Sequence, residues 1–194
     1  MIPARMRLQH DITAVRPFAS GDLSELLELR RRNLEFMAPF EPTRSPAFYS
    51  RAGQARELDL DDAAWRVGAG FAFAVLDTSD DDRLIGRVAL GNVVRGPWQN
   101  ATLGYWIDEA ANGRGHCSRA VELVVRFAFE HAGLHRVQPA IMPRNDRSKR
   151  VVEKVGFRRE GLAVRYLEIA GVWEDHELFA MTVEEWRERG GGVP

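Results

Sequence analysis

A strand that leads through a glycine-containing loop into an apolar helix decides the fold, and it reads Leu103-Gly-Tyr-Trp-Ile-Asp-Glu-Ala-Ala-Asn-Gly-Arg-Gly-His-Cys-Ser-Arg-Ala120. Because Gly113 and Gly115 have no side chain, the loop backbone can approach a ligand closely. The first N–H groups of the helix lack partners within it and lie at the positive end of its dipole. This arrangement predicts an anion site suited to a diphosphate, to which Arg114 would add charge. A purely structural turn is the competing interpretation.

Two familiar phosphate-binding loops do not fit this stretch. A P-loop requires Lys and then Ser or Thr after its second glycine, whereas His116 follows Gly115. A dinucleotide-binding fingerprint requires a third glycine or alanine at position 118, which is Ser here, and its strand does not come in mid-chain after a hairpin. The loop therefore belongs to neither class.

Apolar periodicity on both sides of the loop predicts the remaining elements. Strands are expected over residues 12–18, 71–76, 84–94, 101–107, 137–142, 157–169 and 172–183. Helices are expected from Ser20 to about Leu34 and over residues 47–64, 118–132 and 145–155, with Gly133 and Gly156 ending the last two. This order predicts an α/β (α+β) fold with a central mixed, twisted sheet of about seven strands, antiparallel in its first half, and helices on both faces. We expect one domain over residues 1–194, with residues 190–194 as a flexible tail.

Composition excludes several classes of protein. The 194 residues include 27 basic and 28 acidic side chains, which argues against direct nucleic-acid binding. The longest apolar run, residues 71–76, is far too short to span a membrane, and the N-terminus has no apolar signal segment. A single cysteine, Cys117, excludes an internal disulfide, and no histidine spacing suggests a metal site. We therefore expect a cytoplasmic protein without a metal.

Charge is distributed unevenly along the chain. Acidic residues dominate residues 57–82 and 168–189, whereas basic residues dominate residues 114–165. Solvated surface explains most of these charges. The alternative is a site for a compact polyanion, flanked by surface that favours a basic partner.

The glycine loop resembles the acetyl-CoA loop of the GCN5-related N-acetyltransferase (GNAT) family. That family's pattern is Gln/Arg-x-x-Gly-x-Gly/Ala, and this chain has Asn112-Gly-Arg-Gly-His-Cys117, which departs from it at the first and last positions. The later stretch Asn145-Asp-Arg-Ser148, followed by Gly-Phe-Arg-Arg-Glu-Gly161, resembles the signature of the RimJ/RimL type of ribosomal-protein N-terminal acetyltransferases. The segment from Tyr166 to His176 also resembles this type of acetyltransferase. The region around Phe40 resembles it more loosely.

The resemblance implies a GNAT fold and direct transfer of an acetyl group from acetyl-CoA to a primary amine, most simply the N-terminal amine of a ribosomal protein. It implies that Asn145 holds the pantetheine amide, that Ser148 supplies a proton to the leaving thiolate, and that backbone N–H groups between Tyr105 and Ile107 stabilise the oxyanion. The cofactor-binding residues that it implies are Trp106, Ile107, Gly113, Arg114, Gly115, His116, Cys117, Ser118, Asn145 and Ser148.

The catalytic base is the least defined part of this hypothesis. Many members of the family carry Glu just before the Leu-Gly-Tyr triplet, where this chain has Thr102. The candidates are Glu168 and a water relay. Asn145 and Ser148 also fit a plain helix cap, and Cys117 is interpreted as a small packed residue.

Two other functions remain open at this stage. One is acetylation of small amines, such as an aminoglycoside, a polyamine or an amino acid. The other is a CoA-binding module without turnover, which the absent glutamate motivates. A monomer and a homodimer are both compatible with the sequence.

Overall fold

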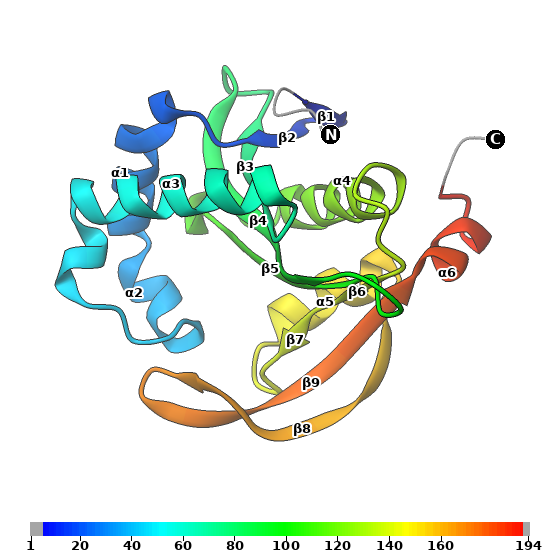
Figure 1. The fold of residues 1–194 in the computed structure, drawn as a ribbon. Helices are drawn as coiled ribbons and strands as arrows, with labels where there is room; N and C mark the ends of the chain where they lie inside the picture. Colours follow the sequence, from blue (N-terminus) through cyan, green and yellow to red (C-terminus); the bar gives the residue numbers. More distant parts are fainter. Residues whose placement is uncertain (1–5, 192–194) are drawn as a thin grey trace.

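A computed structural model describes residues 6–191 of the protein (Figure 1). Residues 192–194 of the expected tail lie outside the described residues, whereas the N–H groups of Gly190 and Gly191 donate to the carbonyls of Arg187 and Trp186. The nine strands of the described part are β1 (Leu8–His10), β2 (Thr13–Pro17), β3 (Phe71–Asp77), β4 (Arg83–Val94), β5 (Asn100–Ile107), β6 (Arg136–Gln138), β7 (Ala140–Ile141), β8 (Arg158–Ile169) and β9 (Val172–Thr182). The α-helices are α1 (Leu23–Arg32), α2 (Leu34–Met37), α3 (Arg51–Val67), α4 (His116–Glu130), α5 (Asp146–Val155) and α6 (Val183–Glu188). Short 3-10 turns occupy residues 20–22, 38–40, 46–49 and 109–111.

The predicted fold class is confirmed. The sheet is mixed and runs in the order β1-β2-β3-β4-β5-β6-β9-β7, with β8 paired to β9, and β1 to β5 are antiparallel neighbours. The strand predicted over residues 137–142 is divided at Pro139, which has no N–H to donate to a neighbouring strand. This division and the short β1 account for the two strands beyond the seven that were expected.

Helix bounds differ from the prediction where side chains compete for the backbone. Asn33 interrupts the first predicted helix because its Nδ2 donates both to the carbonyl of Leu29 and to Asp108. The second helix starts at Arg51 because Ser50 caps it by accepting from Gly53 N–H. The unpredicted α6 begins with a capping box between Thr182 and Glu185.

Two apolar clusters cover opposite faces of the sheet. In β3, Phe71, Phe73 and Val75 join the cluster that includes α4, whereas Ala74 and Leu76 join the one that includes α1. This alternation is the period of two expected for a strand buried on both faces. Helices α4 and α5 pack together on one face, and α1 packs on the other. Helix α3 contacts α1 and contributes to both clusters, with Leu58 in the α1 cluster and Trp65 in the α4 cluster.

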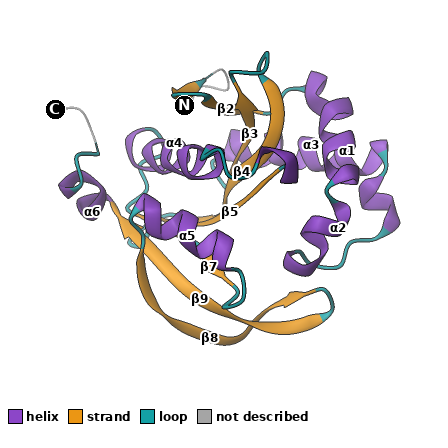
Figure 2. Cartoon of the chain, turned by 180° about the vertical axis from the view of Figure 1, so that it is seen from behind, coloured by secondary structure: helices purple, strands orange, loops and turns teal. Residues whose placement is uncertain are grey.

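The sheet opens between β5 and the last strands. Strand β5 pairs in parallel with β6 only over residues 100–102, and beyond that its partner chain turns away at Pro139. The long β8–β9 hairpin therefore diverges from the rest of the sheet, and its tip lies beside the segment that follows α2 in both views (Figures 1 and 2). The amide of Ala170 in that tip donates to the carbonyl of Glu41.

Candidate active site

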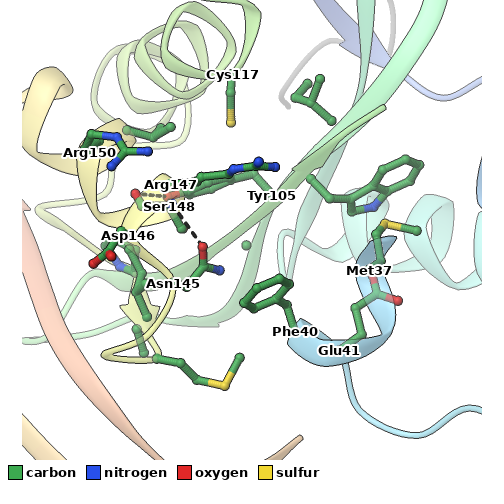
Figure 3. Close-up of a pocket in the computed structure, with 18 of the residues that line it drawn as sticks. Met37, Phe40, Glu41, Tyr105, Cys117, Asn145, Asp146, Arg147, Ser148 and Arg150 are labelled. Atoms are coloured by element: carbon green, nitrogen blue, oxygen red, sulfur yellow. Dashed lines mark hydrogen bonds between the residues drawn. The ribbon is translucent and has the colours of Figure 1, made fainter. Parts of the chain in front are cut away.

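A cavity of about 620 Å³ fills the opening between β5 and β7. On the α4–α5 face it is lined by Asn112, Cys117 and the start of α5, including Asn145 and Ser148 (Figure 3). On the opposite side it is lined by α2 and the turn after it, namely Phe36, Met37, Phe40 and Glu41. The cavity thus reaches both faces of the sheet, so two molecules could meet at β5 from opposite sides.

Ser148 and Tyr105 form the polar centre of the α4–α5 side. The Tyr105 hydroxyl lies 2.8 Å from Ser148 Oγ and donates to the Ser148 carbonyl at 3.1 Å (Figure 3). Asn145 Oδ1 accepts from Ser148 N–H at 3.1 Å, which caps α5 and fixes where Ser148 stands. The two hypotheses for Asn145 and Ser148, helix cap and site residue, are compatible in this geometry.

The glycine loop has the backbone conformation that its sequence predicts. Gly113 and Gly115 have φ of 81° and 83°, a left-handed conformation that side chains rarely adopt. Gly115 is the N-cap of α4, so the N–H groups of His116, Cys117 and Ser118 are the first of the helix. Helix α4 consequently starts two residues earlier than predicted.

The side chains of Arg114 and His116 face Asp77 below the loop. Arg114 Nη1 donates to Asp77 Oδ2 at 2.7 Å, and its Nη2 donates to Ser79. His116 is buried, with Nδ1 2.9 Å from Thr13 Oγ1, and burial lowers its pKa despite the nearby Asp77. These contacts hold the two side chains against Asp77 and Thr13. Because the His116 side chain is buried there, His116 can contact a ligand only through its backbone.

Two protonated groups, Tyr105 and Cys117, line the Ser148 side of the cavity and are half-buried. Burial raises the pKa of Tyr105 well above its ordinary range. Burial likewise raises the pKa of the Cys117 thiol to about 12, so it stays protonated at neutral pH. This side of the cavity can therefore offer hydrogen-bond donors to a departing anion.

On the other side, Glu41 is held by a buried arginine. Arg30 Nη1 donates to Glu41 Oε1 at 2.7 Å, and the Arg30 guanidinium lies 4.2 Å from the centre of the Trp106 ring. Burial lowers the pKa of Arg30, and Glu41 opposes that effect. The pair places a carboxylate at the cavity wall next to an apolar surface formed by Met37 and Phe40.

Long-range contacts join this wall to the β8–β9 hairpin. Arg144 Nη1 pairs with Glu174 at 2.7 Å while its Nη2 donates to the carbonyl of Pro39 at 3.2 Å. Together with the bond between Ala170 and Glu41, these contacts connect α2, β7 and the hairpin around one end of the cavity.

The structure brings together part of the predicted site. Of the predicted residues, Trp106, Ile107, Cys117, Asn145 and Ser148 line the cavity. Gly113, Arg114, Gly115, His116 and Ser118 are not among its lining residues and belong to the adjoining loop and helix start. Glu168 is exposed on β8, opposite Trp173, and does not line the cavity.

Sequence reasoning gave no role to Glu41, Arg144 or His176, all of which line the cavity. The segments that contain Glu41 and His176 stood out by resemblance, but nothing in the sequence showed that they meet. Of the aromatic residues, Phe36 and Phe40 line the cavity, whereas Trp65 packs against Phe71, Phe73 and Phe127 in the core.

No helix within residues 6–191 is both long and apolar enough to cross a membrane. No group of three or more His, Cys, Asp or Glu side chains within the same residues is arranged to hold a metal ion.

Comparison with known proteins gives consistent matches. Residues 13–158 match the acetyltransferase (GNAT) domain family. The chain is 40% identical over 167 residues to "Probable N-acetyltransferase YjcK" of Bacillus subtilis, which covers 86% of this chain and 92% of that protein. It is 32% identical over 182 residues to the ribosomal protein uS5-alanine N-acetyltransferase of Escherichia coli, covering 94% of this chain and 93% of that protein. The solved structure of Mycobacterium smegmatis RimJ in complex with CoA-disulfide matches with a TM-score of 0.84 and 27% identity, covering 92% of this chain and 90% of that chain.

Proposed function

The chain belongs to the GNAT acetyltransferase family, and we propose that it transfers an acetyl group from acetyl-CoA to the N-terminal α-amine of a ribosomal protein. The observation that carries this proposal is the cavity that reaches both faces of the sheet at β5. One side offers a glycine loop and proton donors, and the other offers an apolar wall with a carboxylate. The named relatives that act on ribosomal protein uS5 or bind a CoA derivative support both halves of the proposal.

The glycine loop fits the diphosphate of the donor. Its N-cap glycine leaves the first N–H groups of α4 pointing out of the helix, and a 15-residue helix contributes its dipole at that end. A side chain at Gly115 would be strained by its φ of 83°, and its Cβ would come within 2.7 Å of Arg119 Nη1, so the Arg119 guanidinium would have to move. The thioester of acetyl-CoA supplies an activated acetyl group, and the chain's own residues supply the rest.

Beyond Thr102, the edge of β5 that faces β7 has no strand partner in the part of the chain that the structure describes. Backbone N–H groups at Tyr105 to Ile107 can therefore bind the oxygen of the acetyl group as negative charge develops on it. Ser148 stands at the same place with its hydroxyl next to Tyr105. Because its hydroxyl is hydrogen-bonded to that of Tyr105, Ser148 can pass a proton to the sulfur that leaves.

The amine enters from the side of α2 and the β8–β9 hairpin. Its ammonium form is attracted by the Glu41 carboxylate, which Arg30 holds at the cavity wall. An extended N-terminal segment suits an opening bounded by separate segments better than a closed pocket does. The acidic stretches 57–82 and 168–189 favour a basic partner, as ribosomal proteins are.

The setting follows from this activity. We propose that all 194 residues form a single acetyltransferase domain that acts in the cytoplasm, as a monomer or a homodimer, and that contacts the protein substrate and not RNA. Size-exclusion chromatography with light scattering distinguishes the two oligomeric states.

A thiol-release assay with acetyl-CoA tests the proposal. The acceptors are ribosomal-protein N-terminal peptides that begin with Ala, Ser or Thr, compared with aminoglycosides, polyamines and free amino acids. Turnover on one class of peptide is the expected result. Turnover only on small amines would assign the protein to small-amine acetylation. If no acceptor gives turnover although acetyl-CoA still binds, the result would favour a CoA-binding module without catalytic activity.

A further inference from the structure

His176 is a buried histidine on the acceptor side of the cavity. It lines the cavity and is only 3% exposed. Its neighbour Glu177 faces α5, because Glu177 Oε1 lies 3.9 Å from Lys149 Nζ. Successive side chains of a strand point to opposite faces, so His176 faces away from α5, on the same face as Glu174. Glu174 in turn is joined through Arg144 to the segment that follows α2.

The hydrogen bond of the ring fixes which nitrogen can accept a proton. His176 Nδ1 lies 3.0 Å from the carbonyl oxygen of Glu174. A carbonyl oxygen can only accept, so Nδ1 carries the proton in the neutral ring and Nε2 keeps a free lone pair. Among residues 6–191 Nε2 has no hydrogen-bond partner, and the residue borders the cavity.

The other titratable groups that line the cavity are less suited to accept a proton. Glu41 is already engaged, because its Oε1 accepts from Arg30 Nη1 at 2.7 Å. Asp146 is paired with Lys149, which lowers its pKa. Tyr105 and Cys117 stay protonated because burial raises their pKa values.

We propose that His176 is the general base that takes the proton from the attacking amine, an inference that rests on the acetyltransferase function proposed above. The nitrogen of the amine forms its bond to the acetyl carbon, and one N–H proton passes to His176 Nε2. The bond between carbon and sulfur breaks, and the sulfur receives a proton from the Ser148–Tyr105 pair. Solvent takes the proton from His176 and restores the one on Ser148, so a neutral amine and acetyl-CoA become the amide and CoA with no net change in protons. An amine that arrives as the ammonium first gives one further proton to His176 Nε2, which passes it to solvent.

The tautomer is the first test, and it needs no substrate. Long-range ¹H–¹⁵N spectra of the full chain report which ring nitrogen is protonated, and the His176→Gln variant assigns the signal. We expect the proton on Nδ1. A neutral ring protonated on Nε2 would overturn the proposal, because Nε2 would then be a donor and could not accept the proton of the amine.

Kinetics provide the second test. His176→Gln keeps a polar side chain of similar length but has no basic nitrogen, and we expect its kcat to fall about 100-fold, as for the loss of a general base. Acetyl-CoA affinity and Tm should stay as in the wild type. His135→Gln removes an exposed histidine outside the cavity and is the matched control. If His176→Gln does not fold, His176→Asn replaces it, since a shorter amide still donates to the Glu174 carbonyl.

An acceptor with a less basic amine separates base catalysis from packing. The loss in His176→Gln should shrink at least fivefold for a peptide that begins with trifluoroalanine, because more of that amine is already neutral. An equal loss with both peptides would mean that His176 only packs, and a large loss in Glu168→Gln with none in His176→Gln would return the base to Glu168. If the wild type acetylates only small amines, the same comparison is made with the amine that it uses. The proposal of a protein acceptor can then be wrong while the proposal that His176 is the base is still tested.

Discussion

The two ends of the cavity are built in different ways. At the donor end, the loop of Gly113 and Gly115 and the cap of α5 depend on backbone conformation and on residues within two helix starts, to which β5 adds the Tyr105 hydroxyl beside Ser148. At the acceptor end, side chains from segments far apart in the sequence converge. Arg144 reaches Pro39, 105 positions away, and the hairpin tip reaches Glu41.

This difference suggests a division of labour. Acetyl-CoA is the same donor for every acceptor. A binding site made of backbone groups suits it, because few substitutions can alter such a site. An acceptor that differs between relatives is suited to side chains on α2 and on a hairpin that diverges from the sheet, because these can vary without disturbing the core. The comparison predicts that substitutions at the donor end abolish binding or chemistry, whereas those at the acceptor end change the preference for substrate.

The largest effect is expected for Gly115→Glu at the donor end. A side chain there strains a residue with φ of 83°, collides with Arg119 and brings a negative charge to the anion site. We expect the Kd for acetyl-CoA, measured by calorimetry, to rise at least 100-fold. Gly96→Glu is the matched control, since Gly96 has φ of 71° and open space around it. Unchanged affinity in Gly115→Glu would place the diphosphate elsewhere.

The next effect is expected for Ser148→Ala. Removing the hydroxyl leaves the cap of α5 intact, because Asn145 accepts from the Ser148 N–H, which the variant keeps. We expect kcat to fall about 100-fold with little change in the Kd for acetyl-CoA, as for the loss of a general acid. Ser24→Ala, an exposed serine on α1, should behave as the wild type. A Ser148→Ala enzyme within threefold of wild-type kcat would contradict the role of Ser148 as proton donor.

A smaller effect is expected for Arg144→Ala at the acceptor end. The variant loses the pair with Glu174 and the bond to Pro39, which together align the hairpin with α2. We expect the KM for the peptide to rise about tenfold, equivalent to ~1.4 kcal/mol, while acetyl-CoA affinity is unchanged. Arg159→Ala removes a pair with Glu177 at the same 2.7 Å distance on the other face of the hairpin and should leave the KM unchanged. Weaker acetyl-CoA binding in Arg144→Ala would show that the two ends are not separate.

The same contrast explains what could be predicted from the sequence. The glycine loop and the cap by Asn145 are local, and the pattern of apolar residues gave the fold class and the helices that carry them. The observed bounds of helices and strands differ from the predicted ones where a single residue overrides the apolar pattern. Asn33 does so at the end of α1, and Pro139 does so between β6 and β7.

The acceptor end could not be derived in this way. Which face of β8 and β9 carries a residue depends on register, and β8 has irregularities between Arg159 and Gly161 and between Ala163 and Leu167. The sequence therefore could not show toward which face of the hairpin Glu168 points. In the structure Glu168 lies opposite Trp173, which is an odd number of positions from His176 and so points to the other face of β9. Arg30 and Glu41 meet only because α1 and the turn after α2 fold together.

Cys117→Ala is expected to have the smallest effect at neutral pH, and its behaviour at high pH tests whether the donor end excludes water. Burial raises the pKa of its thiol to about 12, above the roughly 8.5 of a thiol in an unfolded chain. The folded protein thus holds this proton more tightly than the unfolded chain does, so the unfolding free energy falls as pH rises through that interval and is unaffected below it. We expect the wild type to lose about 1 kcal/mol per pH unit more than Cys117→Ala between pH 9 and 11, measured by urea unfolding. Parallel pH profiles for the two proteins would mean that water reaches Cys117, and the donor end would then be as open as the acceptor end.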